Sequence, residues 1–336
     1  MPNTILYEDE HLVCIEQSGT RDDIVIVTFS EMLMRPHADQ RIWAGTPLQK
    51  LGYASIGFVA KASNWFPQAS VEKVAKVVRA RLETYPARIG YGFSMGGWAV
   101  LHYAKMFDLN VSIAFSPQYS INSDEVADRR FSPHFDPVLH KNVAITKDKG
   151  AQFNLVIWDP YDRGDHESAV KIASSIETML VPLAFVGHGS VRCVTSTQTL
   201  GDLLSATVAH NHVEIRRILN ATRRNAPARA VNLAHTIAQR KPHIAFSIYC
   251  KYSDSFPANH RAAFFYKFRK TCYREKCFEE LNQMYEAQKE VNGFLPVFAL
   301  FLKEMGRLDE AKKYIARAVE LHDTPNNRFI AKQINC

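Results

Sequence analysis

The residues of this sequence that could carry out covalent chemistry are centred on Ser94. Glycines stand two positions before it and two after it, at Gly92 and Gly96. A serine hydroxyl is a poor nucleophile, so an enzyme that uses one presents it on a sharp strand-to-helix turn. A β-carbon at either glycine would collide with the strand or the helix beside that turn. The spacing therefore predicts a nucleophile elbow with Ser94 as the nucleophile.

A base for this serine is predicted at His188. It stands between Gly187 and Gly189, directly after the apolar stretch 180–186. An imidazole can take a proton from the serine and return it to a leaving group near neutral pH, which other side chains do less well. The flanking glycines let the histidine loop approach the elbow closely. We therefore expect His188 to act as general base and then as general acid.

Three aspartates compete for the role of the acid that orients this histidine. All follow the apolar stretch 153–158, so each stands near the end of a predicted strand. Asp162 is the first choice, because it lies just before the turn into the next helix. Asp165 is the second choice, since it could instead cap that helix. Asp159, immediately before Pro160, is the third.

These groups need a scaffold that brings distant parts of the chain together. Strands are predicted at 24–29, 51–60, 86–91, 110–117, 153–158 and 180–186, and helices at 71–82, 98–104 and 169–179. Segment 24–29 is apolar on both faces, as a central parallel strand must be, and 4–8 with 11–16 reads as an edge hairpin. The alternation predicts an α/β fold with a mostly parallel, doubly wound sheet. Strand ends in such a sheet share one rim, which would gather the serine, the aspartate and the histidine.

Acyl chemistry also needs N–H donors for the oxyanion of the tetrahedral intermediate. One is expected from Met95, the residue after the nucleophile. The other is expected from the loop that follows strand 24–29, where Phe29 and Ser30 are the candidates. The His-Gly pair usual in that loop is absent.

Two loops are candidates for contact with a substrate. Trp65 lies in an aromatic loop after strand 51–60, although a ring packed on the rim of the sheet would explain it equally well. The polar excursion 117–151 is longer than an ordinary connection and contains Tyr119 and His134. Surface loops are polar whether or not they bind anything, so the substrate stays open.

Together these features make residues 1–208 resemble the α/β-hydrolase superfamily. Gly92 to Gly96 resembles its elbow, Asp162 its acid and Gly187-His188 its histidine loop, in the chain order Ser, Asp, His. The resemblance implies a serine hydrolase of the carboxylic-ester type, with no metal or organic cofactor. It would cleave an acyl ester, thioester or amide of a small molecule, saccharide or lipid through an acyl-serine. An acyltransferase with the same three side chains is the alternative.

Residues 209–336 have a different character. The predicted strands stop, helical stretches follow one another, and 22 Lys and Arg stand against 12 Asp and Glu. Segment 298–321, with Gly306 between two helices and small residues at Ala311 and Ala318, resembles a tetratricopeptide repeat. We therefore predict an all-α, repeat-like domain, whose surface could dock a protein partner. A helical appendage that only stabilises the fold or a dimer is an equally good alternative. A catalytically silent adaptor is the rival interpretation. Nucleic acid is disfavoured, since no recognition motif accompanies the basic run 216–229.

Overall composition sets the remaining expectations. The 336 residues carry a formal charge of +7 and are too many for one average domain. The sequence holds no apolar run of about 18 residues, and its start lacks the order of a signal peptide. Six scattered cysteines form no metal-binding spacing. We therefore expect a cytoplasmic protein with reduced thiols.

Overall fold

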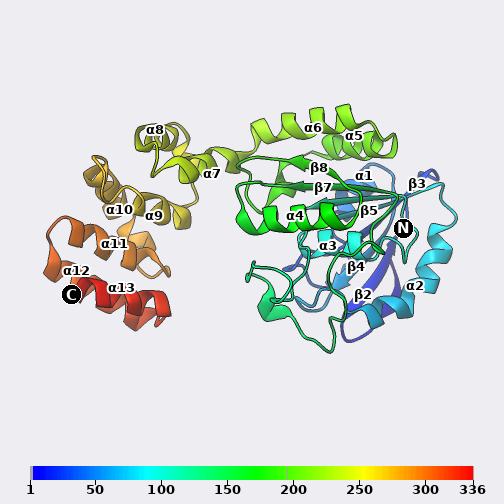
Figure 1. The fold of residues 1–336 in the computed structure, drawn as a ribbon, viewed down its shortest axis with the longest axis horizontal. Helices are drawn as coiled ribbons and strands as arrows, with labels where there is room; N and C mark the ends of the chain where they lie inside the picture. The colour runs from blue at the N-terminus through cyan, green and yellow to red at the C-terminus, as the bar shows by residue number, and fades with distance from the viewer. Residues whose placement is uncertain (1–2, 195, 336) are drawn as a thin grey trace. The chain divides into compact units, whose positions relative to one another are not determined.

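The computed structural model describes residues 3–194 and 196–335 (Figure 1). The chain divides into two compact units, residues 1–226 and 227–336. The first unit is built on one eight-stranded sheet. Its strands are β1 (Thr4–Glu8), β2 (Leu12–Gln17), β3 (Ile24–Phe29), β4 (Ala54–Ala60), β5 (Ala87–Phe93), β6 (Val111–Phe115), β7 (Phe153–Trp158) and β8 (Met179–Pro182).

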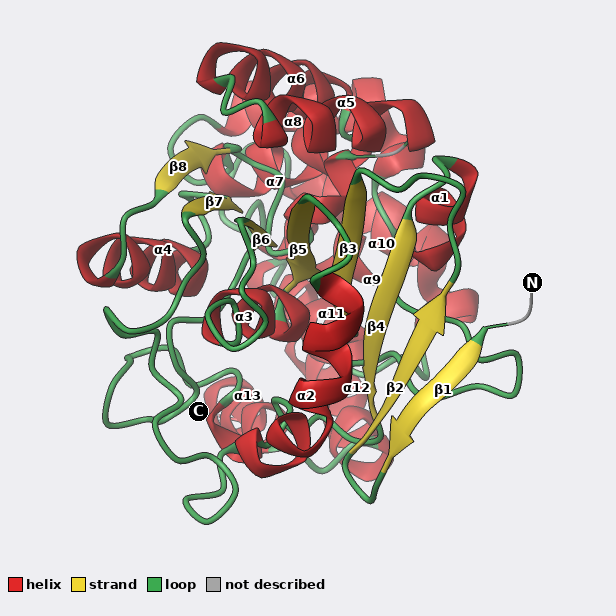
Figure 2. Ribbon diagram, turned by 90° about the vertical axis from the view of Figure 1, so that its right-hand side faces the viewer, coloured by secondary structure: helices red, strands yellow, loops and turns green. Residues whose placement is uncertain are grey.

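The sheet has the order β1-β2-β4-β3-β5-β6-β7-β8, which Figure 2 shows with the strands in yellow. Strand β2 is antiparallel to both of its neighbours, and all the other pairs are parallel. The predicted α/β class and the predicted edge hairpin are thus confirmed. Strand β5 lies between β3 and β6, with Phe93 opposite Phe115. The carboxyl end of β5 therefore lies near the middle of the edge that the carboxyl ends of the parallel strands form.

Helices cover both faces of this sheet. They are α1 (Gly45–Lys50), α2 (Gln68–Leu82), α3 (Met95–His102), α4 (Arg163–Ser175), α5 (Thr197–Val208) and α6 (His212–Asn225). Alternate residues of β3 point to opposite faces, so Val25 and Val27 pack in one core with α2, α3 and α4. Ile24 and Ile26 pack in a second core with α5 and α6. Figure 1 shows α4 on one side of β7 and β8, and α5 and α6 on the other.

The boundary between the units falls later than residue 208. Leu203 of α5 and Ile215 and Leu219 of α6 are fully buried in the same core as Ile113 of β6. These two helices therefore complete the cover of the sheet, and the first unit ends after α6. Composition alone could not place this boundary, because helices that cover a sheet and helices of a separate unit have the same period.

Strand β8 is shorter than the predicted stretch 180–186. It ends at Pro182, which has no backbone N–H to continue a ladder. The next amide, that of Leu183, donates to the carbonyl of Trp158 at 2.7 Å, and Phe185 has a φ of 69°. The chain thus leaves the sheet early and forms a longer loop that leads to His188.

The second unit is all-helical, as predicted. Its helices are α7 (Pro227–Ile237), α8 (Pro242–Tyr252), α9 (Ala258–Tyr266), α10 (Arg274–Gln288), α11 (Phe294–Glu304), α12 (Leu308–Leu321) and α13 (Pro325–Asn335). Gly306 turns between α11 and α12 with a φ of 77°, and Ala311 and Ala318 are buried. This is the geometry expected of one helical hairpin, and the relation to tetratricopeptide repeats stays a prediction.

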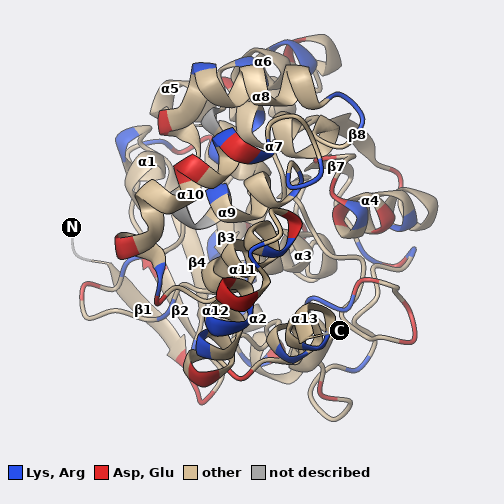
Figure 3. Cartoon of the chain, turned by 90° about the vertical axis from the view of Figure 1, so that its left-hand side faces the viewer, with Lys and Arg blue, Asp and Glu red and all other residues tan. Residues whose placement is uncertain are grey.

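Charges of both signs occur along the helices of the second unit, with Lys and Arg in blue and Asp and Glu in red in Figure 3. Arg307, the N-cap of α12, pairs with Glu310 at 2.6 Å, and Arg317 of α12 pairs with Glu320 at 3.0 Å. Part of the positive charge is thus matched within the helix that bears it. Among the helices of the described residues, none has the length and apolar character needed to cross a bilayer.

Candidate active site

The turn after β5 has the geometry that the sequence predicts. Ser94 has φ 52° and ψ −119°, a conformation that L-residues seldom adopt, and helix α3 begins at the next residue. A β-carbon added to Gly92 would lie 2.2 Å from the carbonyl oxygen of Gly96. One added to Gly96 would lie 2.2 Å from the carbonyl oxygen of Phe29. Both glycines are therefore required by close packing, and the strain at Ser94 is held by the strand and the helix beside it.

Three side chains meet at this turn in one hydrogen-bonded line. The Nε2 atom of His188 lies 2.9 Å from Ser94 Oγ. On the other side of the ring, His188 Nδ1 lies 2.8 Å and 3.0 Å from the two carboxylate oxygens of Asp165. With Nδ1–H donating to the carboxylate, Nε2 is the unprotonated nitrogen and can accept the proton of the serine. The three groups come from residues that lie up to 94 positions apart.

The acid in this line is Asp165 and not Asp162, our first choice. Asp165 lies in the first turn of α4, and its side chain is 2 % exposed. Asp162 is the N-cap of the same helix, where its carboxylate accepts the N–H of Asp165 at 3.0 Å. The sequence argument had assigned these two roles the other way round. An Asp at a helix start can cap the helix or face the rim, and the sequence does not show where the first turn begins.

Asp159, the third candidate, holds the histidine loop. It is 2 % exposed and accepts the backbone N–H groups of Phe185 at 3.1 Å and Gly187 at 2.6 Å. It also accepts the N–H of Tyr161 at 2.9 Å. A buried carboxylate with three N–H donors is well satisfied, and here it fixes the chain that carries His188.

A guanidinium lies behind the acid. Arg130 donates to Asp165 at 2.9 Å and to Asp128 at 2.7 Å, and it lies within 3.1 Å of Asp162. Burial disfavours its charge, but the hydrogen bond to Asp128 and the charges of Asp165 and Asp162 raise the pKa of Arg130 above its ordinary value. Arg130 therefore stays charged and keeps three carboxylates in one place. Arg130 belongs to the polar excursion 117–151, for which the sequence predicts contacts with a substrate and not with the acid.

A second histidine close to the elbow has a different environment. His102, in the last turn of α3, stacks on Trp98 with ring centroids 4.4 Å apart. Burial lowers the pKa of His102 to about 3, so this ring is neutral near pH 7. It is packed in the core, whereas 27 % of the His188 side chain is exposed. Of these two rings, His188 is the one that a substrate can reach.

The predicted oxyanion donors divide into two groups. Met95 is the first residue of α3, and the first-turn N–H groups of a helix have no partner within it, so Met95 stays a candidate. The structure contradicts the prediction for Ser30, since its N–H donates to the carbonyl of Phe58 at 2.8 Å. The Ser30 hydroxyl in turn accepts the N–H of Ala60 at 3.0 Å. Phe29 turns its carbonyl toward the elbow, and a carbonyl cannot donate.

The candidates for substrate contact lie around this site but are not equally accessible. Trp65 is fully buried and packs against Phe131 and His134, with ring centroids 5.6 Å and 5.4 Å away. Tyr119 packs partly buried against the core, with the ammonium group of Lys171 5.7 Å from its ring centre. His134 is also partly buried, and its ring stacks on that of Trp65. Contact of Tyr119 or His134 with a substrate remains a prediction, whereas Trp65 is a residue of the packed core.

The sequence argument missed one side chain beside the nucleophile, that of Gln118. It is 3 % exposed, and its Nε2 lies 3.3 Å from Ser94 Oγ. Its position two residues after Ser116, at the end of a central strand, was the signal available in the sequence. A polar residue at that place lies on the same rim as the elbow.

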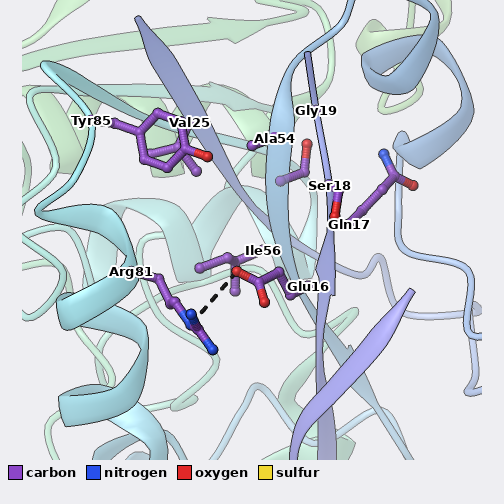
Figure 4. A pocket seen from close by; sticks show the side chains of 10 residues that line it. Glu16, Gln17, Ser18, Gly19, Val25, Ala54, Ile56, Arg81 and Tyr85 are labelled. Carbon is purple, nitrogen blue, oxygen red and sulfur yellow. Dashed lines mark ion pairs between the residues drawn. The ribbon is translucent and has the colours of Figure 1, made fainter. Parts of the chain in front are cut away.

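A cavity of about 270 Å³ lies elsewhere in the first unit, where Arg81 and Glu16 form an ion pair of 3.7 Å (Figure 4). Val25 and Ala54, which also line it, stand at the amino ends of β3 and β4. Ser94 follows the carboxyl end of β5, so this cavity lies at the opposite edge of the sheet. Within the described residues, no group of three His, Cys, Asp or Glu side chains is placed to hold a metal ion.

The strand order, the elbow and the chain order Ser, Asp, His define the α/β-hydrolase fold, which the resemblance predicted.

No family model and no curated protein matches this sequence. The capsule O-acetyltransferase of Neisseria meningitidis serogroup A is a similar solved structure, with 12 % identity, a TM-score of 0.39, and cover of 63 % of this chain and 93 % of that one. Est1E from Butyrivibrio proteoclasticus has 14 % identity, a TM-score of 0.39, and cover of 54 % and 89 %. The esterase of Pyrobaculum calidifontis has 14 % identity, a TM-score of 0.39, and cover of 64 % and 81 %. Likeness at this level carries no argument about activity, which is argued from the site itself.

Proposed function

We propose that this protein is a serine hydrolase that cleaves an acyl ester, or a related thioester or amide, through an acyl-serine. The observation that carries the proposal is the continuous line from Ser94 Oγ through both ring nitrogens of His188 to Asp165, with each step between 2.8 and 3.0 Å. Nucleophile and base within hydrogen-bonding reach, with the base oriented by a third group, is the arrangement that activates a serine. A catalytically silent adaptor would not need this line.

The proposed reaction has two halves. In the first half, Ser94 Oγ attacks the acyl carbonyl while His188 Nε2 accepts its proton, and the carbonyl oxygen takes the electron pair. When the tetrahedral intermediate collapses, the bond to the leaving group breaks and His188 gives the proton to that group. In the second half, water attacks the acyl-serine with His188 again as base. The acyl group leaves as a carboxylic acid, and Ser94 regains its proton.

Asp165 supports both halves through His188. Its charge stabilises the imidazolium that forms in each transition state, and its hydrogen bond keeps the ring in the tautomer that exposes Nε2 as an acceptor. The ion pair with Arg130 holds the carboxylate in this position.

The acyl acceptor decides between hydrolase and transferase, because both form the same acyl-serine. Ser94 is 4 % exposed, and its surroundings do not choose among saccharide, lipid and small-molecule esters. Water needs no binding site of its own, so hydrolysis is the simpler reaction and is the one proposed.

The test is turnover of a short aryl ester such as 4-nitrophenyl acetate by the full chain, with product acid measured as well as phenol. We expect turnover by the wild type and none above background by Ser94→Ala. An alcohol added as acceptor would lower the acid-to-phenol ratio if the protein is a transferase. If the wild type does not release acid or transfer the acyl group from any of a panel of esters, thioesters and amides, the proposal fails.

A further inference from the structure

The side-chain amide of Gln118 lies beside the nucleophile, and the triad does not account for it. Its Nε2 is 3.3 Å from Ser94 Oγ and 3.4 Å from the carbonyl oxygen of Ser116. The residue is 3 % exposed, so its polar atoms need partners within the protein. Burial of such a side chain is costly unless its amide is hydrogen-bonded, and here the NH₂ group is bonded to the nucleophile itself.

The orientation of this amide is determined by Trp65. The indole Nε1–H can only donate, and it lies 3.3 Å from Gln118 Oε1. The oxygen of the amide must therefore face Trp65, and the NH₂ group must face Ser94. The indole itself cannot turn away easily, because it is fully buried between neighbours that include Phe131 and His134. Trp65 also has a backbone φ of 45°, a conformation that L-residues seldom adopt and that the surrounding packing must hold.

Of Met95 and Ser30, two of the predicted backbone donors for the oxyanion, only Met95 keeps its N–H available in the structure. The N–H of Met95 is available at the start of α3. The expected second donor, Ser30, has its N–H in a bond to Phe58 and its hydroxyl in a bond with Ala60. An N–H that already donates to a buried carbonyl cannot also stabilise an oxyanion without breaking that bond.

We propose that the side-chain amide of Gln118 is an oxyanion donor of this site and that Trp65 fixes its orientation. This inference rests on the proposed function and assigns one more catalytic group to it. The oxyanion and Ser94 Oγ are bonded to the same carbon in the tetrahedral intermediate. A donor within 3.3 Å of Oγ at rest therefore needs only a small shift to reach the oxyanion. Resting hydrogen bonds at active sites are often long and tighten in the transition state.

The same contact has a use before the reaction begins. By donating to a lone pair of Ser94 Oγ, the amide leaves the serine proton free to point at His188 Nε2, 2.9 Å away. The donor thus favours the productive rotamer of the hydroxyl at rest. In the transition state it would stabilise negative charge.

The test compares Gln118→Leu, which removes the donor, with Gln118→Glu, which keeps the shape and the acceptor for Trp65 but replaces the NH₂ by an oxygen. We expect kcat for an aryl ester to fall about 10²- to 10³-fold in both variants, with KM changed far less, because a donor used mainly in the transition state is lost. Affinity for a trifluoromethyl ketone that mimics the tetrahedral intermediate should fall by a similar factor. Gln49→Leu, at an exposed glutamine of α1, is the matched control and should keep wild-type kinetics.

A third variant, Trp65→Phe, keeps an aromatic ring at this position but removes the pyrrole part of the indole and with it the Nε1–H. It should lower kcat in the same direction by a smaller factor, because the amide loses the partner that orients it. If Gln118→Leu unfolds, as thermal melting would reveal, Gln118→Glu and Trp65→Phe still decide the question. Wild-type kcat and wild-type inhibitor affinity in these variants would overturn the inference, whereas an inactive wild type would instead overturn the proposed function.

Discussion

Replacement of Ser94 by alanine is expected to lower kcat/KM for an acyl ester by about 10⁵- to 10⁶-fold, and His188→Ala should cost nearly as much. Removing either residue breaks the same proton transfer, since Oγ and Nε2 are 2.9 Å apart and act as one unit. The double variant Ser94→Ala, His188→Ala should therefore be no slower than either single variant, within a few-fold. Steady-state kinetics on the four proteins measure this directly.

The non-additivity separates a catalytic pair from two residues that only support the fold. Two independent structural roles would multiply their effects, and the double variant would be far slower than either single one. Thermal unfolding of each variant is the control, because the proposed roles do not require a loss of stability. If His188→Ala retained activity close to that of the wild type, the assignment of His188 as base would be wrong.

The second large effect is expected at Asp165. Asp165→Asn should lower kcat by about 10⁴-fold, because an amide NH₂ facing Nδ1 favours the tautomer with Nε2–H, which cannot accept the proton of Ser94. Asp162→Asn is the matched control on the same helix, three residues earlier. Asparagine is also a good N-cap, so that variant should keep activity within several-fold and lose little stability. Kinetics and melting temperatures of the two variants test the assignment.

Because each variant replaces one carboxylate by an amide, their relative activities show which of the two aspartates orients His188. Both carboxylates contact Arg130, so loss of that ion pair alone would affect the two variants similarly. A large loss in Asp162→Asn together with a small loss in Asp165→Asn would restore the original sequence-based choice. Equal losses would mean that the network around Arg130 matters more than the contact with His188.

The sequence was sufficient to predict the sheet class and the elbow, because both depend on local patterns. Segment 24–29 is apolar except at Thr28, and it forms the fully buried strand β3. The glycines around Ser94 are required by contacts within the turn and with the strand next to it. His188 followed from the end of an apolar stretch, although β8 is shorter than that stretch. Apolar periodicity and the need for glycine in a tight turn are properties of short segments, so they can be recognised in the sequence before the fold is known.

The acid and the oxyanion donors depended on information that is not local. Asp162 is the N-cap of α4, and Asp165 lies in the first turn of that helix and contacts His188. If the helix began three residues later, Asp165 would be the N-cap instead. Ser30 was excluded by a hydrogen bond to Phe58, a residue 28 positions away. The orientation of the Gln118 amide is set by a hydrogen bond from Trp65, which lies 53 positions earlier. Such contacts are set by the packing of the sheet, and no spacing in the sequence encodes them.

The account depends most on Ser94 being a nucleophile that His188 activates. The most direct measurement is the intact mass of the full chain after incubation with a fluorophosphonate, followed by identification of the modified peptide. The account predicts one adduct per chain in the wild type, located on Ser94, with none in Ser94→Ala and much slower labelling in His188→Ala. An unmodified wild type, or an adduct of equal yield in Ser94→Ala, would contradict it.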